Sequence, residues 1–177
     1  MKTSLIILFV IMLPCWGFCQ NKNAFDPAPV NFVIKNAGLN VNGSINGLEG
    51  FITMDPQGKA PVKIEGTIDP NTIKTGIGMR DNHLKKADYF NVKEFPKIYM
   101  ISTLVTKNSG HKYTGNFDLT IKDIKKNISI PFIFSTTRNG YTLQGEFSIN
   151  RLDFGLGETS MILSDTVKII IEITAKQ

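Results

Sequence analysis

Apolar and polar residues alternate at every second position along most of this chain, and this period of two constrains the fold more than any other feature. The pattern is clearest over residues 113–121, 141–149 and 167–174. Successive side chains of a β-strand point to opposite faces, so these segments have one dry and one wet face, as in antiparallel sheets. Eight strands are predicted on this basis, over residues 30–37, 44–54, 62–69, 97–106, 112–122, 126–136, 141–150 and 165–175.

Short turn segments separate most of these strands and favour an up-and-down order of neighbours. Residues 55–58 (DPQG), 108–110 (NSG) and 138–140 (RNG) combine the residue types that are typical of tight turns. Asn-Gly, at the third of these positions, is the strongest hairpin signal.

The longest gap between predicted strands runs over residues 70–96. We interpret it as a loop that carries a short helix over residues 83–88, with Asp81 or Asn82 as the helix cap. No long amphipathic helix is predicted that could cover the apolar face of the sheet.

The sheet must therefore close on itself as a barrel or stack against a second sheet. An eight-stranded barrel has an interior just wide enough for side chains or for one small ligand. Gly66, Gly115 and Gly145 lie on the apolar faces of predicted strands. Glycines in strands mark bends or the close approach of another group, so these three indicate a barrel that is sharply bent, hollow, or both.

The first residues have the features of an export signal. Lys2 provides a positive start, residues 5–13 an apolar run, and residues 17–19 a small-x-small cleavage site. We expect cleavage before Gln20, which predicts a periplasmic or secreted protein with a signal peptide over residues 1–19 and one domain over residues 20–177.

Both cysteines of the chain, Cys15 and Cys19, lie within this predicted signal. A lipid anchor is disfavoured because Pro14 and Phe18 stand directly before them, where a lipoprotein signal has a small residue. The mature domain would contain no cysteine, so we expect packing alone to stabilise it.

The chain has 20 lysines and arginines against 15 acids, a formal net charge of +5. The basic residues are densest at 85–86 and 122–126, in predicted turns or helix, rather than on one face interleaved with aromatic residues. This favours a solvated surface over nucleic-acid binding, and at most a peripheral contact with an anionic membrane. A homodimer stays open at this point.

The segment TIKTGIGMRDNHLKKADYFNVKEFPKIYMIST, residues 72–103, places Arg80, Asp81 and His83 between two predicted strands. It resembles the polyisoprenoid-binding YceI family, whose members carry T-G, R-D-x-H-L, F-x-x-x-x-F/Y-P and S-T in this order. Further matches are FVIKNAG, GNFDLTIKDIKKNISIPF and FSINRLDFG, so the resemblance extends from about residue 30 to the C-terminus. It implies a lipocalin-like barrel that holds a polyisoprenoid or a related long-chain amphiphile, which together with the strand count above predicts an eight-stranded antiparallel lipocalin-like barrel.

A hollow lumen would be lined by the apolar residues on the dry faces of the strands. The candidates are Ile64, Phe117, Leu119, Phe132, Phe134, Leu143, Phe147, Ile169 and Ile171. Such a surface suits a hydrocarbon chain, because burying one CH₂ group contributes about 0.8 kcal/mol. The leading interpretation is an exported binding protein for a polyisoprenoid, an isoprenoid quinone or a related lipid.

The cluster of Arg80, Asp81 and His83 has two interpretations. In the structural one, Asp81 caps the short helix, Arg80 makes hydrogen bonds across the loop, and His83 packs on the rim of the barrel. In the functional one, Arg80 and His83 contact the polar head of the ligand, for which a planar guanidinium is well suited. Arg151, in the FSINRLDFG segment, could take either part.

Two other classes of protein are alternatives: a hydrolytic enzyme and a structural barrel. A hydrolytic enzyme could use His83 with Asp81 and Asp88, but no G-x-S-x-G motif is present and the predicted mature chain has no cysteine. Zinc is disfavoured because His83 and His111 are the only histidines. The sequence predicts neither cofactor nor metal. A structural or stress-response barrel without a ligand is the remaining alternative.

Overall fold

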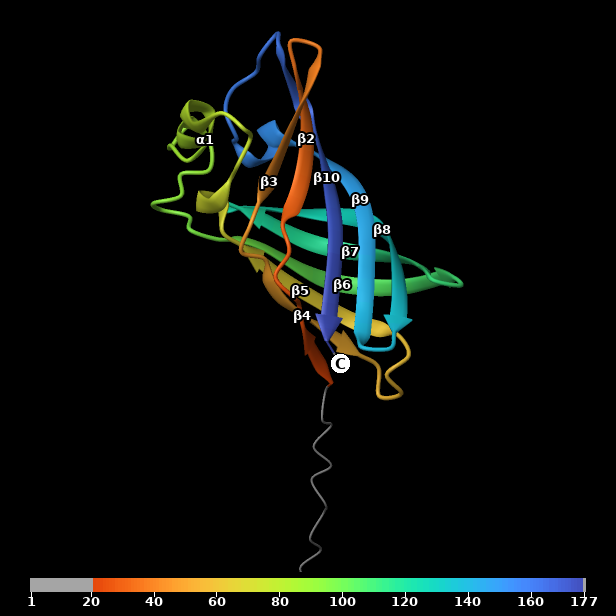
Figure 1. The fold of residues 1–177 in the computed structure, drawn as a ribbon. Helices are drawn as coiled ribbons and strands as arrows, with labels where there is room; N and C mark the ends of the chain where they lie inside the picture. The colour runs from red at the N-terminus through yellow and green to blue at the C-terminus, as the bar shows by residue number, and fades with distance from the viewer. Residues whose placement is uncertain (1–20, 177) are drawn as a thin grey trace, which may run out of the picture.

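The computed structural model describes residues 21–176. Within this range the chain forms one antiparallel sheet of ten strands that curls around an interior (Figure 1). The strands are β1 (Lys22–Ala24), β2 (Val30–Asn36), β3 (Leu39–Ile45), β4 (Glu49–Met54), β5 (Pro61–Ile68), β6 (Ile98–Ser109), β7 (Lys112–Ile121), β8 (Ile124–Thr137), β9 (Gly140–Asn150) and β10 (Leu163–Lys176). Their order in the sheet is β1-β4-β5-β6-β7-β8-β9-β10-β2-β3. The predicted signal and its cleavage site, residues 1–20, lie outside the described residues.

The all-β class, the antiparallel pairing and the turns at residues 55–58, 108–110 and 138–140 are confirmed. The count of eight strands is wrong, for two reasons. The segment predicted as one strand over residues 44–54 is divided between β3 and β4, because Gly47 adopts a φ of +76° and turns the chain. The short strand β1 has no alternating pattern and exists through its pairing with β4.

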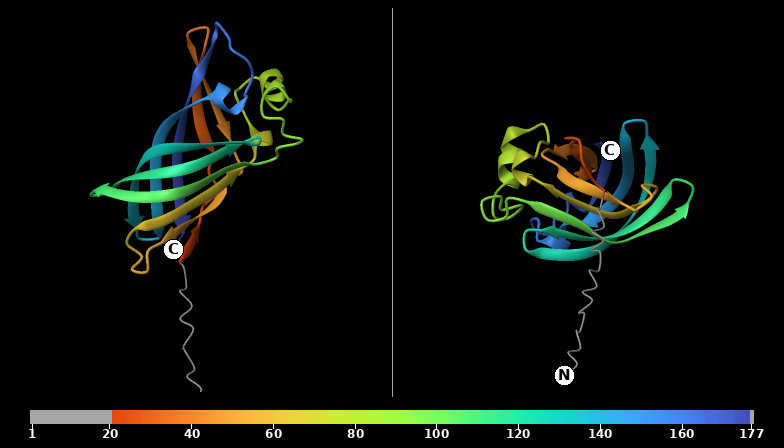
Figure 2. Two further views of the ribbon diagram at one scale, coloured as in Figure 1. Left: turned by 180° about the vertical axis from the view of Figure 1, so that it is seen from behind. Right: turned by 90° about the horizontal axis from the view of Figure 1, so that it is seen from below.

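Near each edge of the curled sheet, backbone hydrogen bonds connect the chain to a segment that is not its neighbour in the strand order. Beyond β1, the backbone N–H of Asp26 donates a hydrogen bond of 2.8 Å to the carbonyl of Thr174 in β10. At the other edge, Ser44 of β3 and Lys74 exchange two backbone hydrogen bonds of 2.9 Å. Figure 2 shows the sheet turning back toward itself as a result.

The long connection between β5 and β6 contains a 3₁₀ turn, η1 (Pro70–Thr72), and one helix, α1 (Gly78–Leu84). The predicted helix over residues 83–88 is therefore placed too late in the chain. The predicted cap is also wrong: Ile77 occupies the cap position without a side-chain hydrogen bond, and Asp81 lies inside the helix. A second 3₁₀ turn, η2 (Arg151–Phe154), follows β9. No helix within residues 21–176 is long and apolar enough to cross a membrane.

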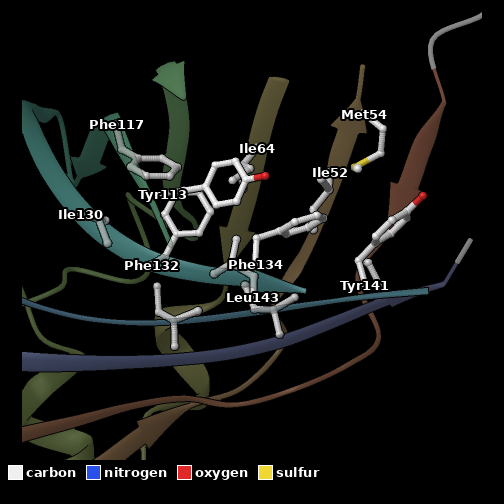
Figure 3. Packing of buried hydrophobic residues seen from close by; sticks show 13 residues of the cluster. Ile52, Met54, Ile64, Tyr113, Phe117, Ile130, Phe132, Phe134, Tyr141 and Leu143 are labelled. Atoms are coloured by element: carbon white, nitrogen blue, oxygen red, sulfur yellow. The ribbon is translucent and has the colours of Figure 1, made fainter. Parts of the chain in front are cut away.

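Aromatic rings from β7, β8 and β9 pack together in the interior near the β6–β7 and β8–β9 turns (Figure 3). Tyr113 stacks on Phe132 with ring centroids 5.6 Å apart, and Phe134 stacks on Tyr141 at 5.5 Å. Tyr113 and Phe134 meet edge to face at 5.9 Å, which joins the two pairs. Each fully buried aromatic side chain contributes roughly 1.5–3 kcal/mol, so this cluster is a main source of stability and closes the interior near these turns.

Candidate ligand-binding cavity

The interior of the curled sheet contains a cavity of about 480 Å³. This volume lies in the range of about 300–1,000 Å³ that is usual for small-molecule sites. Its wall is made almost entirely of apolar side chains from most of the strands, together with residues from the connection that contains α1. Such a wall can bind a hydrocarbon chain, but it has few hydrogen-bonding groups for a polar ligand.

Exposure along the wall identifies a mouth and a floor. His83, Ser160 and Ile162 line the cavity and are exposed, whereas Leu143 and Ile173 line it and are buried. The mouth therefore lies between α1, the β2–β3 hairpin and the loop before β10, at the top of Figure 1. Lining residues of β10 extend from residue 163 to 173, a length of about 30 Å at the rise of a strand.

Along the inward face of β9, the burial of the side chains decreases from the floor of the cavity toward its mouth. Tyr141 and Leu143 are buried, but Gly145, Phe147 and Ile149 on the same face are only half-buried. All of these residues except Tyr141 line the cavity. Phe147 and Ile149 pack against the buried clusters on one side and line the cavity on the other, which leaves them half-buried.

Eight of the nine predicted lumen residues lie on the cavity wall: Ile64, Phe117, Leu119, Phe132, Leu143, Phe147, Ile169 and Ile171. Phe134 does not line the cavity, because it is enclosed between Tyr113 and Tyr141 at the floor.

Several lining residues were not among those predicted from sequence. The strand β2 contributes Val30, Phe32 and Ile34, whose spacing of two was a signal that could have found them. Tyr89 and Phe90 come from the connection after α1, where no periodic pattern marks them.

The three strand glycines serve different purposes. Gly66 and Gly145 line the cavity, and a β-carbon at Gly145 would lie 3.2 Å from the carbonyl oxygen of Pro131. At Gly115, a β-carbon would overlap the ring of Phe117, so this glycine leaves room for a neighbouring aromatic side chain. A close approach therefore occurs at Gly115 and at Gly145, and Gly145 also lines the hollow interior together with Gly66.

At the mouth, Thr75, Arg80 and Asp81 form a compact hydrogen-bond network. The backbone N–H and the hydroxyl of Thr75 both donate to Oδ1 of Asp81, at 2.8 and 2.6 Å. Arg80 donates from Nε to the Thr75 hydroxyl at 2.7 Å and from Nη2 to the Thr75 carbonyl at 2.6 Å. The hydroxyl of Thr75 is the main reason that the pKa of Asp81 lies below its usual value, and it outweighs the opposing effect of burial.

This network fixes the orientation of Arg80 beside the Asp81 carboxylate, whose pKa the charge of Arg80 also helps to lower. Arg80 lines the cavity and takes part in none of the ion pairs formed within residues 21–176. His83, one helical turn further on, also lines the mouth and meets the ring of Tyr89 edge to face at 5.1 Å. The mouth therefore presents a cation and an imidazole to a ligand whose tail lies deeper.

Arg151 is held differently, although it also reaches the cavity wall. Its side chain is 3% exposed and donates to the carbonyls of Ser164, Leu156 and Glu158 at 3.0, 2.9 and 2.8 Å. It also pairs with the carboxylate of Asp165 at 2.8 Å. These four hydrogen bonds connect η2, the following loop and the start of β10, so Arg151 stabilises the wall of the mouth.

Residues 21–176 contain no group of three or more His, Cys, Asp and Glu residues arranged to hold a metal ion. A curled antiparallel sheet around one deep apolar cavity, open at one end, defines the class of lipocalin-like barrels. Within this class, the chain belongs to the YceI-like family, because the YceI-like domain matches residues 25–175.

Relatives are found among bacterial proteins. Protein YceI of Salmonella arizonae is 27% identical over 158 residues, which cover 84% of this chain and 81% of that protein. A UPF0312 protein of Yersinia enterocolitica is 33% identical over 103 residues, which cover 57% of this chain. This second match spans 53% of the Yersinia protein, about half of its length.

Solved structures share the fold. BcnA of Burkholderia cenocepacia is similar with a TM-score of 0.77 and 23% identity, over 84% of this chain and 96% of BcnA. A polyisoprenoid binding domain from Saccharophagus degradans is similar with a TM-score of 0.71 and 15% identity, over 89% of this chain and 98% of that domain. At these identities the likeness establishes the architecture.

Proposed function

We propose that this protein binds a polyisoprenoid, an isoprenoid quinone or a related long-chain amphiphile in its cavity. The observation that carries the proposal is the apolar cavity of about 480 Å³ that extends from an exposed mouth to an aromatic floor. Membership of the YceI-like family and the fold shared with a polyisoprenoid binding domain support the same ligand class.

The expected affinity is modest and the exchange reversible. Burial of an isoprene unit of five carbons would contribute roughly 3–4 kcal/mol before costs. Several units would exceed the practical limit of non-covalent affinity, about 18–21 kcal/mol, so the cost of ordering the chain must offset much of this sum. A ligand that is already dissolved in a membrane gains less still, because its tail is out of water there.

The polar groups of the mouth fit a ligand with an oxygen-bearing head. Arg80 is oriented by Thr75 and has N–H groups on Nη1 that no hydrogen bond within residues 21–176 uses. In this proposal Arg80 and His83 contact the head group, while Arg151 maintains the wall around them. These residues bind and orient a ligand, which together with the family favours a binding protein over an enzyme.

Export is a separate part of the proposal. The signal-like residues 1–19 favour a periplasmic or secreted protein that begins at Gln20. Intact-mass analysis of the protein from the outer compartment tests this. A retained signal or an added diacylglycerol mass would contradict it.

The ligand is tested by mass spectrometry. The protein is purified under gentle conditions, extracted with organic solvent, and the extract is searched for prenyl chains, quinones and other long-chain lipids. A second sample is first incubated with ubiquinone or a polyprenol in detergent and then separated from free lipid. A stoichiometric long-chain lipid in either extract supports the proposal, and its absence from both would reject it.

A further inference from the structure

We propose that the mouth of the barrel docks on the surface of a lipid bilayer, so that the ligand passes between membrane and cavity without crossing water. This inference rests on the proposed lipid-binding function. The docking surface, named the mouth rim, consists of Leu39, Ile77, Met79, Met161 and Ile162.

These five residues are apolar and turned to solvent. Leu39 is 73% exposed, Met79 84% and Met161 104%. Ile77 and Ile162 are 49% and 63% exposed. Large apolar side chains that gather at one end of a protein usually mark an interaction site, and flexible methionines adapt to irregular apolar partners.

The mouth rim comes from three segments that hydrogen bonds connect into one frame. Leu39 follows the turn of the β2–β3 hairpin, where the N–H of Ala37 donates to the carbonyl of Ile162 at 2.7 Å. The loop that carries Met161 is linked in turn to the connection after α1, since the N–H of Gly157 donates to the carbonyl of Asp88 at 2.7 Å. Figures 1 and 2 show these segments at the same end of the molecule as α1.

The other exposed large apolar residues of the described chain, which include Phe51, Tyr99 and Ile101, lie in strands and do not line the cavity. Val62, Leu104 and Ile133 lie in strands on the outer wall, at 52%, 56% and 46% exposure, and do not line the cavity. Single apolar residues of this kind are normal on protein surfaces. The mouth rim differs because one of its members, Ile162, also belongs to the cavity wall, so apolar surface continues from the rim into the lumen.

Charges beside the mouth rim favour an anionic bilayer as the partner. Lys74, Lys85 and Lys86 flank α1 and take part in none of the ion pairs formed within residues 21–176. The acids beside these lysines are Asp81, whose pKa the charge of Lys74 helps to lower, and Asp88 in the connection after α1; Glu158 lies on the opposite loop. An apolar rim with adjacent lysines is the pattern by which peripheral proteins lie in the interface of anionic membranes.

The test compares two triple variants of matched chemistry. The rim variant is Leu39→Gln, Met79→Gln and Met161→Gln, and the control variant is Val62→Gln, Leu104→Gln and Ile133→Gln. None of the six positions lines the cavity, and all are exposed. Flotation with phosphatidylcholine–phosphatidylglycerol vesicles measures docking. Uptake of ubiquinone from detergent, and separately from the same vesicles, measures ligand binding and transfer.

The rim variant should bind the vesicles about tenfold more weakly than wild type or worse, and should take up ubiquinone from vesicles correspondingly slowly. Its uptake from detergent should be unchanged, and the control variant should behave as wild type throughout. Equal flotation of both variants would overturn the inference, as would a wild-type protein that takes up ubiquinone from detergent but does not float.

Failure of the proposed function has a different signature, which is no uptake of lipid by wild type from detergent as well as from vesicles. A second copy of the chain is the competing occupant of the mouth rim. Light scattering that shows a wild-type dimer, and a monomer for the rim variant alone, would assign the rim to self-association and overturn membrane docking.

Discussion

Gly157 and Tyr89 pack so closely that a β-carbon on Gly157 would lie 2.8 Å from the Tyr89 ring. The same glycine has a φ of +72° and donates its N–H to the carbonyl of Asp88 at 2.7 Å. This contact joins the loop before β10 to the connection after α1, on the side of the mouth where His83 meets Tyr89. The shape of the mouth therefore depends on a residue without a side chain.

A left-handed backbone conformation costs an alanine about 1–2 kcal/mol. We expect Gly157→Ala to lower the free energy of unfolding by more than this amount. The excess comes from the displaced ring of Tyr89. Gly76→Ala is the matched control, because Gly76 has a φ of +84° and no atom within 4 Å of the added carbon. Urea denaturation of both variants measures the difference. Equal losses would mean that the Tyr89 ring moves aside without cost.

Asp81 should make stability depend on pH in the acid range. Its pKa in the folded protein lies below the usual value of 3.8, chiefly through the Thr75 hydroxyl. As the pH falls, the unfolded chain therefore binds a proton at this carboxyl before the folded protein does. The stabilisation by ionised Asp81 is complete above about pH 4 and is lost as the pH falls through the lower pKa of the folded protein. Asp81→Asn should melt below wild type at pH 7, and the gap should narrow as the pH falls below 4. A gap that stays constant in thermal melts down to pH 3 would contradict this.

Arg80 and Arg151 should respond differently to substitution by glutamine. Arg151→Gln leaves the buried carbonyl of Leu156, two half-buried carbonyls and the partly exposed Asp165 without their donor, so it should cost about 1–3 kcal/mol of unfolding free energy. Arg80→Gln should change stability less, and should weaken binding of a prenyl chain with an oxygen-bearing head more than that of the bare hydrocarbon.

The measurement pairs thermal melts with affinities for two ligands that share one tail. If Arg80→Gln lowers both affinities equally and also lowers the melting temperature, its role is structural. Thr75→Val provides the control, because it removes the hydroxyl that orients Arg80 and leaves the guanidinium in place.

Two neighbouring positions of β9 test the lumen. Phe147 lines the cavity and Ser148, the next residue, faces solvent. Phe147→Arg should abolish lipid uptake because an unpaired charge is costly on an apolar wall, whereas Ser148→Arg should leave uptake unchanged. Circular dichroism verifies folding. If Phe147→Arg does not fold, Phe147→Trp serves instead, and it should exclude the longest chains that wild type accepts. Full uptake by both folded Phe147 variants would place the ligand elsewhere.

The sequence by itself determined which residues of a strand face inward, since the period of two is a local property of the extended backbone. It therefore predicted the dry faces of β7 and β9, and the turn at residues 138–140, without knowledge of any partner strand. The family motif around Arg80 likewise marked the connection that borders the mouth.

The tertiary structure alone decided what each inward residue meets. Phe134 and Phe147 have the same inward spacing in neighbouring strands, yet Phe134 is enclosed by aromatic rings whereas Phe147 is half-buried and lines the cavity. The existence of β1 depends on β4, and Asp81 is engaged by Thr75 rather than by the end of a helix. These outcomes depend on side chains brought together from distant parts of the chain, because packing across a barrel is a non-local property that no local period encodes.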